Sequence, residues 1–330
     1  MSGILGIGIL VSCLLAGALI PRAAGGRFAD PPAVVERSIR YSLWALLFVM
    51  GFRIGNDPSI SSRLAELGLL AAATAILAVL GTVAAIVLTF ALAEVLPRRG
   101  GRPVRDAAGE SSAQRADDPG RGGGPGARFK APAALLSIVA GGFLAGLVLP
   151  PLGGVDFSAI AGWALDVLLF FIGMQFAQSG LSLRGTILKP ATLLVPFATA
   201  FGTLSSSLLL VPFFHVGVGK ALALSAGFGW YSLSGVLISN LGDPALGSAA
   251  FLANMFRETI ALLSIPFLAR TRLPVLAVGV GGATAMDVTF SITYFSMGEK
   301  GPENAPLIFA SGALLSLCVP VLVPLFYRLG

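Results

Sequence analysis

Apolar segments about as long as a lipid bilayer is thick recur along most of this chain of 330 residues. A helix needs about 20 mainly apolar residues to cross the hydrocarbon core of a membrane. Hydrophobic residues make up 55% of the chain and charged residues 12%, whereas soluble domains carry about 25% charged residues. So few charges cannot cover the surface of a water-exposed globule of this size. The sequence therefore predicts an all-α polytopic membrane protein.

Eight segments are predicted to cross the membrane as helices. Each is a mostly apolar run that is long enough, or nearly long enough, to span the bilayer. They are 3–20, 34–52, 67–95, 133–149, 163–177, 191–214, 249–269 and 305–327. Two further apolar stretches, 221–241 and 273–298, are interrupted by glycines, and we expect re-entrant or broken helical elements there.

Both interrupted stretches are rich in glycine and hydroxyl side chains, which suit a backbone that turns while it is buried among other helices. If 221–241 crossed fully, Arg270 and Arg272 would lie outside, against the preference of Lys and Arg for the cytoplasmic side. A full crossing by 273–298 stays open and would place the C-terminus inside. The glycines predicted to break the helices are Gly227, Gly229, Gly235, Gly281 and Gly282.

One segment, 97–131, has a different composition from the rest. It holds eight Lys or Arg and four Asp or Glu, with a glycine-rich run at 120–124 and no apolar stretch that could fold. This composition is typical of a disordered linker. Its positive charges should stay in the cytoplasm, which predicts an N-terminus outside.

Two short strings occur twice in the same order. Residues 15–21 are matched by 144–150, and residues 46–51 by 168–173. Because three spans separate the copies, the second copy would be inserted upside down, as in the inverted repeats of many secondary transporters. Chance similarity between apolar strings is the alternative. The expected domains are a first repeat (1–96), the linker (97–131), a second inverted repeat (132–220) and a core (221–330) with two re-entrant or broken elements and two spans.

Two acidic residues lie near the middle of apolar stretches, and we expect both near mid-membrane depth. They are Glu258 and Asp287. Burying a carboxylate there costs about 2.5–3.5 kcal/mol on insertion scales, so it normally marks an ion, proton or substrate pathway. A buried pair with Arg257 is the structural alternative for Glu258, and a cap on a broken helix is the alternative for Asp287. Asp166 lies nearer the start of its span, and an interfacial role and a site role are equally open.

Hydrogen-bonding side chains lie close to these acids and to the interrupted stretches. Each is more often a helix-packing group than a ligand, but together they are candidates for a substrate or proton site. They are Tyr231, Ser232, Ser234, Asn254 and Thr284, with Arg257 beside Glu258.

The sequence predicts neither a cofactor nor a metal. It has one histidine and two cysteines, Cys13 and Cys318, each inside an apolar run. We expect both cysteines to be small buried side chains.

Several strings near the interrupted stretches resemble those of a known family. They are 225–235 (Ser-Ala-Gly-Phe-Gly-Trp-Tyr-Ser-Leu-Ser-Gly), 247–251, Arg257-Glu258 and 282–287 (Gly-Ala-Thr-Ala-Met-Asp). The family is that of the bacterial L-lysine exporters of the LysO type. The resemblance is close from about 224 to 287. The basic linker departs from the family pattern.

The resemblance implies a multi-pass exporter of the bacterial inner (cytoplasmic) membrane, not an enzyme. It places the family's two functional intramembrane acids on Glu258 and Asp287. The family is also distantly similar to the cation/proton antiporters and bile-acid symporters, whose sites lie where discontinuous helices meet.

The residues and the resemblance together favour a secondary transporter that exports L-lysine and close cationic analogues in exchange for protons. The two acids would alternate between protons and substrate, and the N-terminal ends of the broken helices, near 229–234 and 281–284, would receive the carboxylate. A sodium or other cation/proton antiporter is the alternative. An intramembrane aspartyl protease is disfavoured because that chemistry needs a pair of aspartates, and a purely structural subunit needs no mid-membrane acid.

Overall fold

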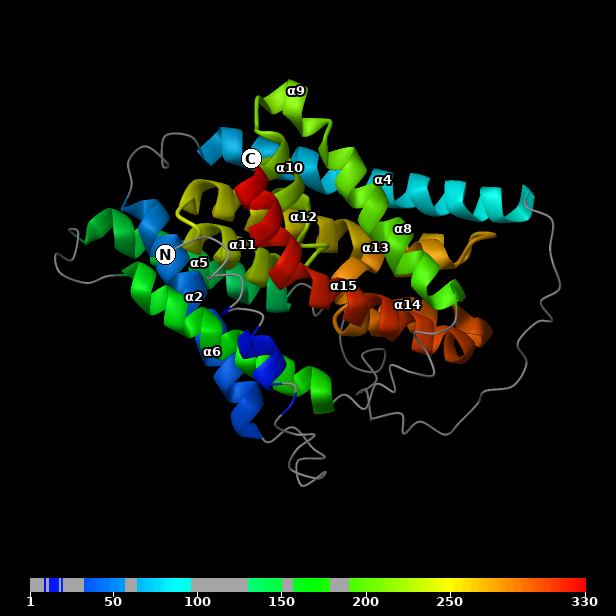
Figure 1. Ribbon diagram of the computed structural model, residues 1–330, viewed down its shortest axis with the longest axis horizontal. Helices are drawn as coiled ribbons and strands as arrows, with labels where there is room; N and C mark the ends of the chain where they lie inside the picture. Colours follow the sequence, from blue (N-terminus) through cyan, green and yellow to red (C-terminus); the bar gives the residue numbers. More distant parts are fainter. Residues whose placement is uncertain are drawn as a thin grey trace.

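The computed structural model describes residues 9, 12–17, 19, 33–56, 64–95, 130–149, 157–178 and 190–330. These residues are helical or lie in turns, and none of them forms a strand, so the all-α prediction is confirmed for the described part of the chain (Figure 1). The elements are α2 (Ala33–Gly55), α4 (Leu64–Val95), α5 (Lys130–Val148), α6 (Phe157–Gln178), α8 (Pro190–Ser207), α9 (Leu210–Phe214), α10 (Val218–Ser225), α11 (Tyr231–Asn240), α12 (Pro244–Leu268), α13 (Val275–Gly281), the 3-10 helix η2 (Gly282–Met286), α14 (Phe290–Ser296), the 3-10 helix η3 (Gly298–Lys300) and α15 (Gly301–Leu329).

Helices long and apolar enough to cross a membrane are found at four places in the described residues. They are Ala65–Leu92, Leu193–Phe214, Pro244–Leu268 and Gly298–Leu329. The predicted spans at 133–149 and 163–177 correspond to shorter apolar helices. Most of the first predicted span, and nearly all of the linker, lie outside the described residues. The protein is a membrane protein, and the count of eight spans stays a prediction.

Glycines allow α2 and α5 to pack with their backbones in contact. A Cβ added to Gly51 of α2 would lie 2.1 Å from the carbonyl oxygen of Val139 on α5. A Cβ added to Gly142 of α5 would lie 2.2 Å from the carbonyl oxygen of Phe48 on α2. Each helix thus offers small residues to the other, which is how close pairs form in membranes. Helix α6 packs on the same α2.

The crossing of α4 and α8 is reciprocal. A Cβ on Gly81 would lie 2.3 Å from the carbonyl oxygen of Gly202, and one on Gly202 would lie 2.2 Å from that of Gly81. The residues that follow them, Thr82 and Thr203, join their hydroxyls at 2.9 Å. Both threonines are buried, so the hydrogen bond satisfies two hydroxyls that lie away from water.

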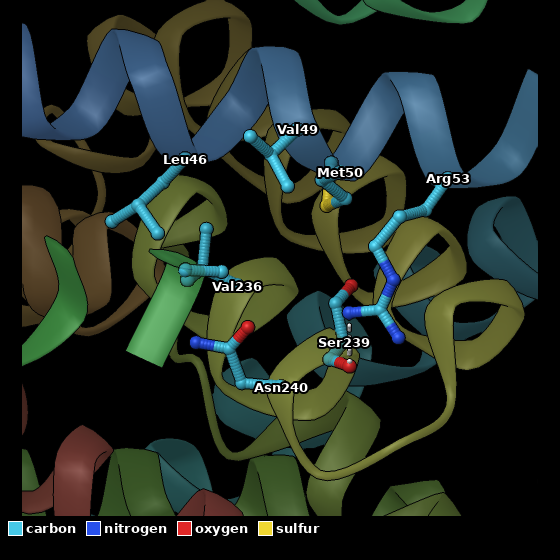
Figure 2. A pocket seen from close by; sticks show the side chains of 8 residues that line it. Leu46, Val49, Met50, Arg53, Val236, Ser239 and Asn240 are labelled. Carbon is cyan, nitrogen blue, oxygen red and sulfur yellow. Dashed lines mark hydrogen bonds between the residues drawn. The ribbon is translucent and has the colours of Figure 1, made fainter. Parts of the chain in front are cut away.

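Helix α2 also contacts the core through α11. Figure 2 shows Arg53 at the end of α2 reaching across a small pocket, where its Nη1 donates to the carbonyl oxygen of Ser239 at 3.1 Å. Leu46, Met50 and Val236 form apolar walls of the same pocket. This contact holds the end of α11 against the α2–α5–α6 group.

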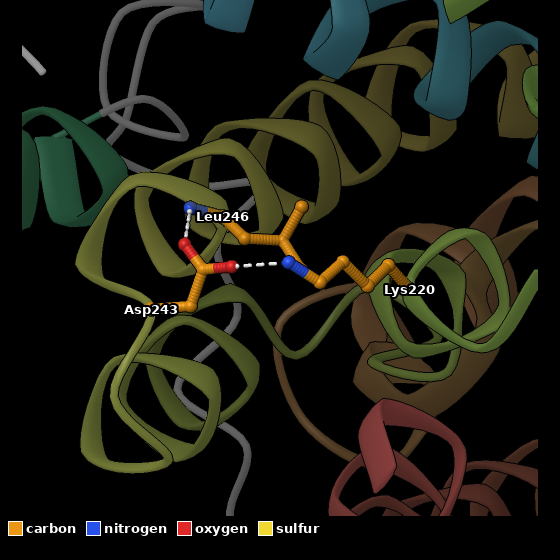
Figure 3. A network of polar contacts seen from close by, with 3 residues as sticks. All are labelled: Lys220, Asp243 and Leu246. Carbon is orange, nitrogen blue, oxygen red and sulfur yellow. Dashed lines mark hydrogen bonds and ion pairs between the residues drawn. The ribbon is translucent and has the colours of Figure 1, made fainter. Parts of the chain in front are cut away.

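The element formed by α10 and α11 starts and finishes at the same end of the molecule. Lys220, near the start of α10, makes an ion pair of 2.9 Å with Asp243, which follows α11 (Figure 3). The other carboxylate oxygen of Asp243 accepts the N–H of Leu246 at 3.0 Å and caps α12. Lys220 and Asp243 line a second pocket, together with Glu66 of α4 and Gly330. Figure 1 places the C-terminus beside α10. The α10–α11 element is therefore a helical hairpin.

The second interrupted element, α13–η2–α14, also returns to the end where it began. A Cβ on Gly312, halfway along α15, would lie 2.3 Å from the backbone nitrogen of Met286. A Cβ on Gly301, the first residue of α15, would lie 2.4 Å from the carbonyl oxygen of Tyr294. The chain thus runs back along α15 to its start, at the end opposite Gly330. Because α12 also runs away from Asp243 to this end, α13 begins there too.

Candidate functional site

The first interruption separates α10 from α11 through a tight turn that needs unusual backbone angles. Phe228 has φ 49° and Gly229 has φ 100°, in the region where side chains with a Cβ are disfavoured. The side chain of Phe228 is fully buried. No side chain caps the start of α11 at Trp230. The helix is thus interrupted between Ser225 and Tyr231, a stretch that includes Gly227 and Gly229.

Asn254, on α12, holds this turn in place. Its Oδ1 accepts the N–H of Gly229 at 2.8 Å. Its Nδ2, which has two N–H donors, lies within hydrogen-bond distance of three acceptors: the carbonyl oxygens of Leu224 and Ala250, at 3.1 and 2.9 Å, and the Oγ of Ser234 at 3.1 Å. An Asn with all of these contacts is satisfied within the protein. Asn254 and Ser234 therefore support the turn and are not free to bind a substrate in this conformation.

The second interruption begins at Gly282, which has φ 62° and ends α13. The next N–H, of Ala283, donates to the carbonyl oxygen of Phe228 at 2.9 Å. A Cβ on Gly282 would lie 2.3 Å from that same oxygen. The two interrupted elements therefore cross in direct main-chain contact, and glycine is required at the crossing.

Hydroxyl groups satisfy the chain after Gly282. The Oγ1 of Thr284 donates to the carbonyl oxygen of Gly281 at 2.8 Å and lies 3.3 Å from the Oγ1 of Thr289. Ser316 of α15 donates to the carbonyl oxygen of Ala283 at 3.3 Å. Thr284 is therefore a local cap for the broken element in this conformation.

Two charged side chains lie buried beside the crossing, and each is 2% exposed. They are Arg257 and Glu258 of α12. The Nη2 of Arg257 donates to the Oγ1 of Thr82 at 3.4 Å, while its Nε and Nη1 have no hydrogen-bond partner, and neither have the two carboxylate oxygens of Glu258. The buried Arg257–Glu258 pair, which was the structural alternative for Glu258, is absent.

Asp287 directly follows η2. Its neighbour Met286 contacts Gly312, about halfway along α15. The side chain of Asp287 is exposed at the surface of the described protein, and its mid-membrane depth stays a prediction. The short 3-10 helix turns this residue outward, and its carboxylate accepts the N–H of Val288. Asp287 still lies close enough to Glu258 and Tyr231 for their charges to interact. The structure thus brings the two predicted acids into one region, one of them buried and one exposed.

The remaining predicted residues divide between the crossing and helix packing. Tyr231 packs edge-on against Phe251, with ring centroids 5.4 Å apart. A Cβ on Gly235 would lie 2.8 Å from the Cβ of Phe251, so Gly235 lets α11 approach α12 and does not break a helix. Ser232 lies in the buried first turn of α11. Asp166 lies on α6.

Comparison with known proteins identifies the family of the chain. The family model described as the lysine exporter LysO matches residues 11–101 and 135–327. The chain belongs to the LysO family. The two matched parts flank the linker region and include both interrupted elements, Arg257 and Glu258.

Two curated LysO relatives match about half of the chain. The lysine exporter LysO of Escherichia coli (strain K12) is 35% identical over 164 residues, which are 50% of this chain and 54% of that protein. The putative lysine exporter of Haemophilus influenzae is 33% identical over 165 residues, which are 50% of this chain and 82% of that protein. The chain thus spans about half the length of the E. coli relative. No solved structure matches.

The sequence analysis of this LysO-family chain did not single out the two threonines where α4 crosses α8. Thr82 and Thr203 come from α4 and α8, and Thr82 is the one hydrogen-bond partner of the Arg257 guanidinium within the described ranges. A threonine within a long apolar helix is usually satisfied by its own helix. The repeated Gly-Thr pair at 81–82 and 202–203 was the signal that could have found them.

Proposed function

We propose that this protein exports L-lysine and close cationic analogues from the cytoplasm, across the bacterial inner membrane, in exchange for protons. Membership of the LysO family supports lysine as the substrate. The observation that carries the proposal is the main-chain contact between Phe228 and Ala283, at the crossing of two interrupted elements, with Arg257 and Glu258 buried beside it. Crossed, broken helices around intramembrane charges are typical of secondary transporters.

Glu258 supplies the coupling chemistry. A carboxylate buried without a hydrogen bond is costly as a charged group, so Glu258 takes either a proton or a cationic partner. An ammonium group of lysine and a proton then compete for the same oxygens. Asp287, exposed and electrostatically coupled to Glu258, offers a second acid through which the proton or the second ammonium group passes. Competition at shared carboxylates makes the transport an antiport.

The contacts between helices favour an inverted-repeat scaffold for this transport. The α4–α8 contact is reciprocal at Gly81 and Gly202, as a two-fold axis between the repeats requires. Gly17 of the first repeat packs on the carbonyl oxygen of Phe170 in α6, and Gly146 of the second packs on that of Phe52 in α2. The first helix of each repeat thus contacts the second helix of the other. Such scaffolds support alternating access.

We assign the end that carries Lys220, Asp243 and Gly330 to the outside, with the N-terminus. The opposite end carries Arg270, Arg272 and Lys300, and positive charge favours the cytoplasmic side. The two hairpins then enter from opposite faces of the membrane, and their tips meet at the Phe228–Ala283 contact.

The test is lysine counterflow in proteoliposomes with a proton-sensitive dye. The wild-type protein should couple lysine movement to proton movement in the opposite direction. Glu258→Gln and Asp287→Asn should each lower coupled transport to background while insertion is unchanged, because they keep the shape and remove the charge. Glu299→Gln is the matched control, since Glu299 is an exposed carboxylate at the end of the molecule.

Normal coupled transport by both acid variants would refute the mechanism. A dye response to sodium without lysine would refute the substrate and favour the cation/proton antiporter.

A further inference from the structure

Arg257 carries more unused hydrogen-bonding capacity than any packing role explains. A guanidinium has five N–H donors, and among the described residues this one makes a single hydrogen bond, the 3.4 Å contact from Nη2 to Thr82. The side chain is 2% exposed. Its Nη2 lies 3.2 Å from the position of a Cβ on Gly282. The free donors are therefore at the crossing of the two interrupted elements.

A buried guanidinium without an anionic partner is strongly unfavourable. No carboxylate among the described residues forms an ion pair or hydrogen bond with Arg257. Glu258 is its sequence neighbour, but successive residues on a helix point about 100° apart, and both Glu258 oxygens lack a partner of their own. The anion that completes Arg257 therefore comes from outside the described protein.

Three main-chain donors at the helix ends that the sequence suggested as carboxylate receptors are already engaged. The N–H of Ala283 donates to the carbonyl oxygen of Phe228, and that of Tyr231 donates to the carbonyl oxygen of Gly229. The N–H of Gly229 itself donates to Asn254. These main-chain donors cannot receive a carboxylate unless the crossing comes apart, whereas Nε and Nη1 of Arg257 can.

We propose that Arg257 binds the α-carboxylate of the transported amino acid, with Thr82 orienting the guanidinium. This inference rests on the proposed function and adds a specificity rule to it. Planar, two-pronged binding is the geometry in which a guanidinium and a carboxylate fit best. Glu258 and Asp287 then receive the ammonium groups. The site selects amino acids over diamines, because a diamine leaves the buried guanidinium without an anion.

The test compares lysine with two probes that lack the carboxylate charge, cadaverine and lysinamide. Purified protein in detergent binds radiolabelled lysine, and each unlabelled compound competes for it. With the wild-type protein, lysine should compete about ten- to a hundredfold better than either probe, which is the range expected for hydrogen bonds to charged groups. In Arg257→Gln this preference should fall to about onefold, and in Arg257→Lys it should be intermediate.

Arg270→Gln is the matched control, because Arg270 follows the same helix, α12, and is exposed. It should keep the wild-type preference. Equal competition by lysine, cadaverine and lysinamide with the wild-type protein would overturn the proposal, even if no Arg257 variant folds. A folded Arg257→Gln protein that keeps the preference would overturn it as well. Failure of the wild-type protein to bind or transport lysine at all would instead refute the proposed function.

Discussion

Replacing Gly282 with alanine should damage the crossing more than any other single methyl group in the protein. Gly282 has φ 62° and ψ −133°, a region that is essentially restricted to glycine and costs other residues about 1–3 kcal/mol. The new Cβ would lie 2.3 Å from the carbonyl oxygen of Phe228. The two interrupted elements would have to separate by about 1 Å to restore ordinary contact.

That separation would also break the hydrogen bond from Ala283 to Phe228, which is 2.9 Å long. Leaving a buried donor without a partner costs about 1–3 kcal/mol. Strain and the lost hydrogen bond together give a loss of about 2–6 kcal/mol in the free energy of unfolding. Titration with SDS in mixed micelles, followed by tryptophan fluorescence, measures this loss, and counterflow measures transport in the same preparation.

Two other glycines separate the causes. Gly229 has φ 100°, but a Cβ there would meet its nearest atom at 3.8 Å, so Gly229→Ala should show the strain alone, about 1–3 kcal/mol. Gly162 of α6 has no atom within 4 Å of an added Cβ, so Gly162→Ala should be neutral or stabilise the helix by up to about 1 kcal/mol. A Gly282→Ala protein as stable as Gly162→Ala would refute the reasoning that the two elements are joined at this contact.

Three further predictions concern the turn, the ion pair and the topology. Asn254→Ala should lower the free energy of unfolding by about 2–4 kcal/mol, because it removes several buried hydrogen bonds at once; an unchanged SDS midpoint would contradict its supporting role. The hydrogen bond to Asp243 raises the pKa of Lys220 above its usual 10.5, so the pair should stabilise the protein below that pH and lose its effect as pH rises through the raised pKa. The contribution should stay under about 1 kcal/mol because Lys220 is partly exposed, and Asp243→Asn, which keeps the helix cap, should abolish this pH dependence of thermal unfolding. In a protein freed of Cys13 and Cys318, a cysteine at position 243 should react with an impermeant thiol reagent from outside and one at Thr271 only after permeabilisation; labelling of 243 from inside would reverse the assigned topology.

The interruptions were predictable because their cause is local. Gly229 and Gly282 adopt backbone angles that favour glycine, and glycine-rich runs inside apolar stretches signal such angles directly. The sequence did not predict which atoms join the two breaks, because the pairing of Phe228 with Ala283 depends on how α12 and α15 place the two hairpins. Sequence position along an apolar run predicts depth, and the mid-membrane depth of both acids stays a prediction.

Other features depend on the direction in which a side chain points and on its hydrogen-bond partners. Position along an apolar run predicts neither of these. The change from an α-helix to a 3-10 helix at Gly282 alters the turn per residue, so the sequence pattern alone did not predict that Asp287 lies on the protein surface. Arg257 was grouped with the acids on proximity alone. Its lack of a carboxylate partner is visible only once α4 supplies Thr82 in place of an acid.

The crossing of the two hairpins is made by main-chain atoms, and this has a consequence for how proteins of the LysO family diversify. The bond between residues 228 and 283 uses a carbonyl and an amide that every residue except proline can supply at position 283. The backbone angles fix glycine at positions 229 and 282. Side chains around the crossing can therefore be exchanged one at a time, by evolution or by protein engineering, while the main-chain contact between the two hairpins stays in place.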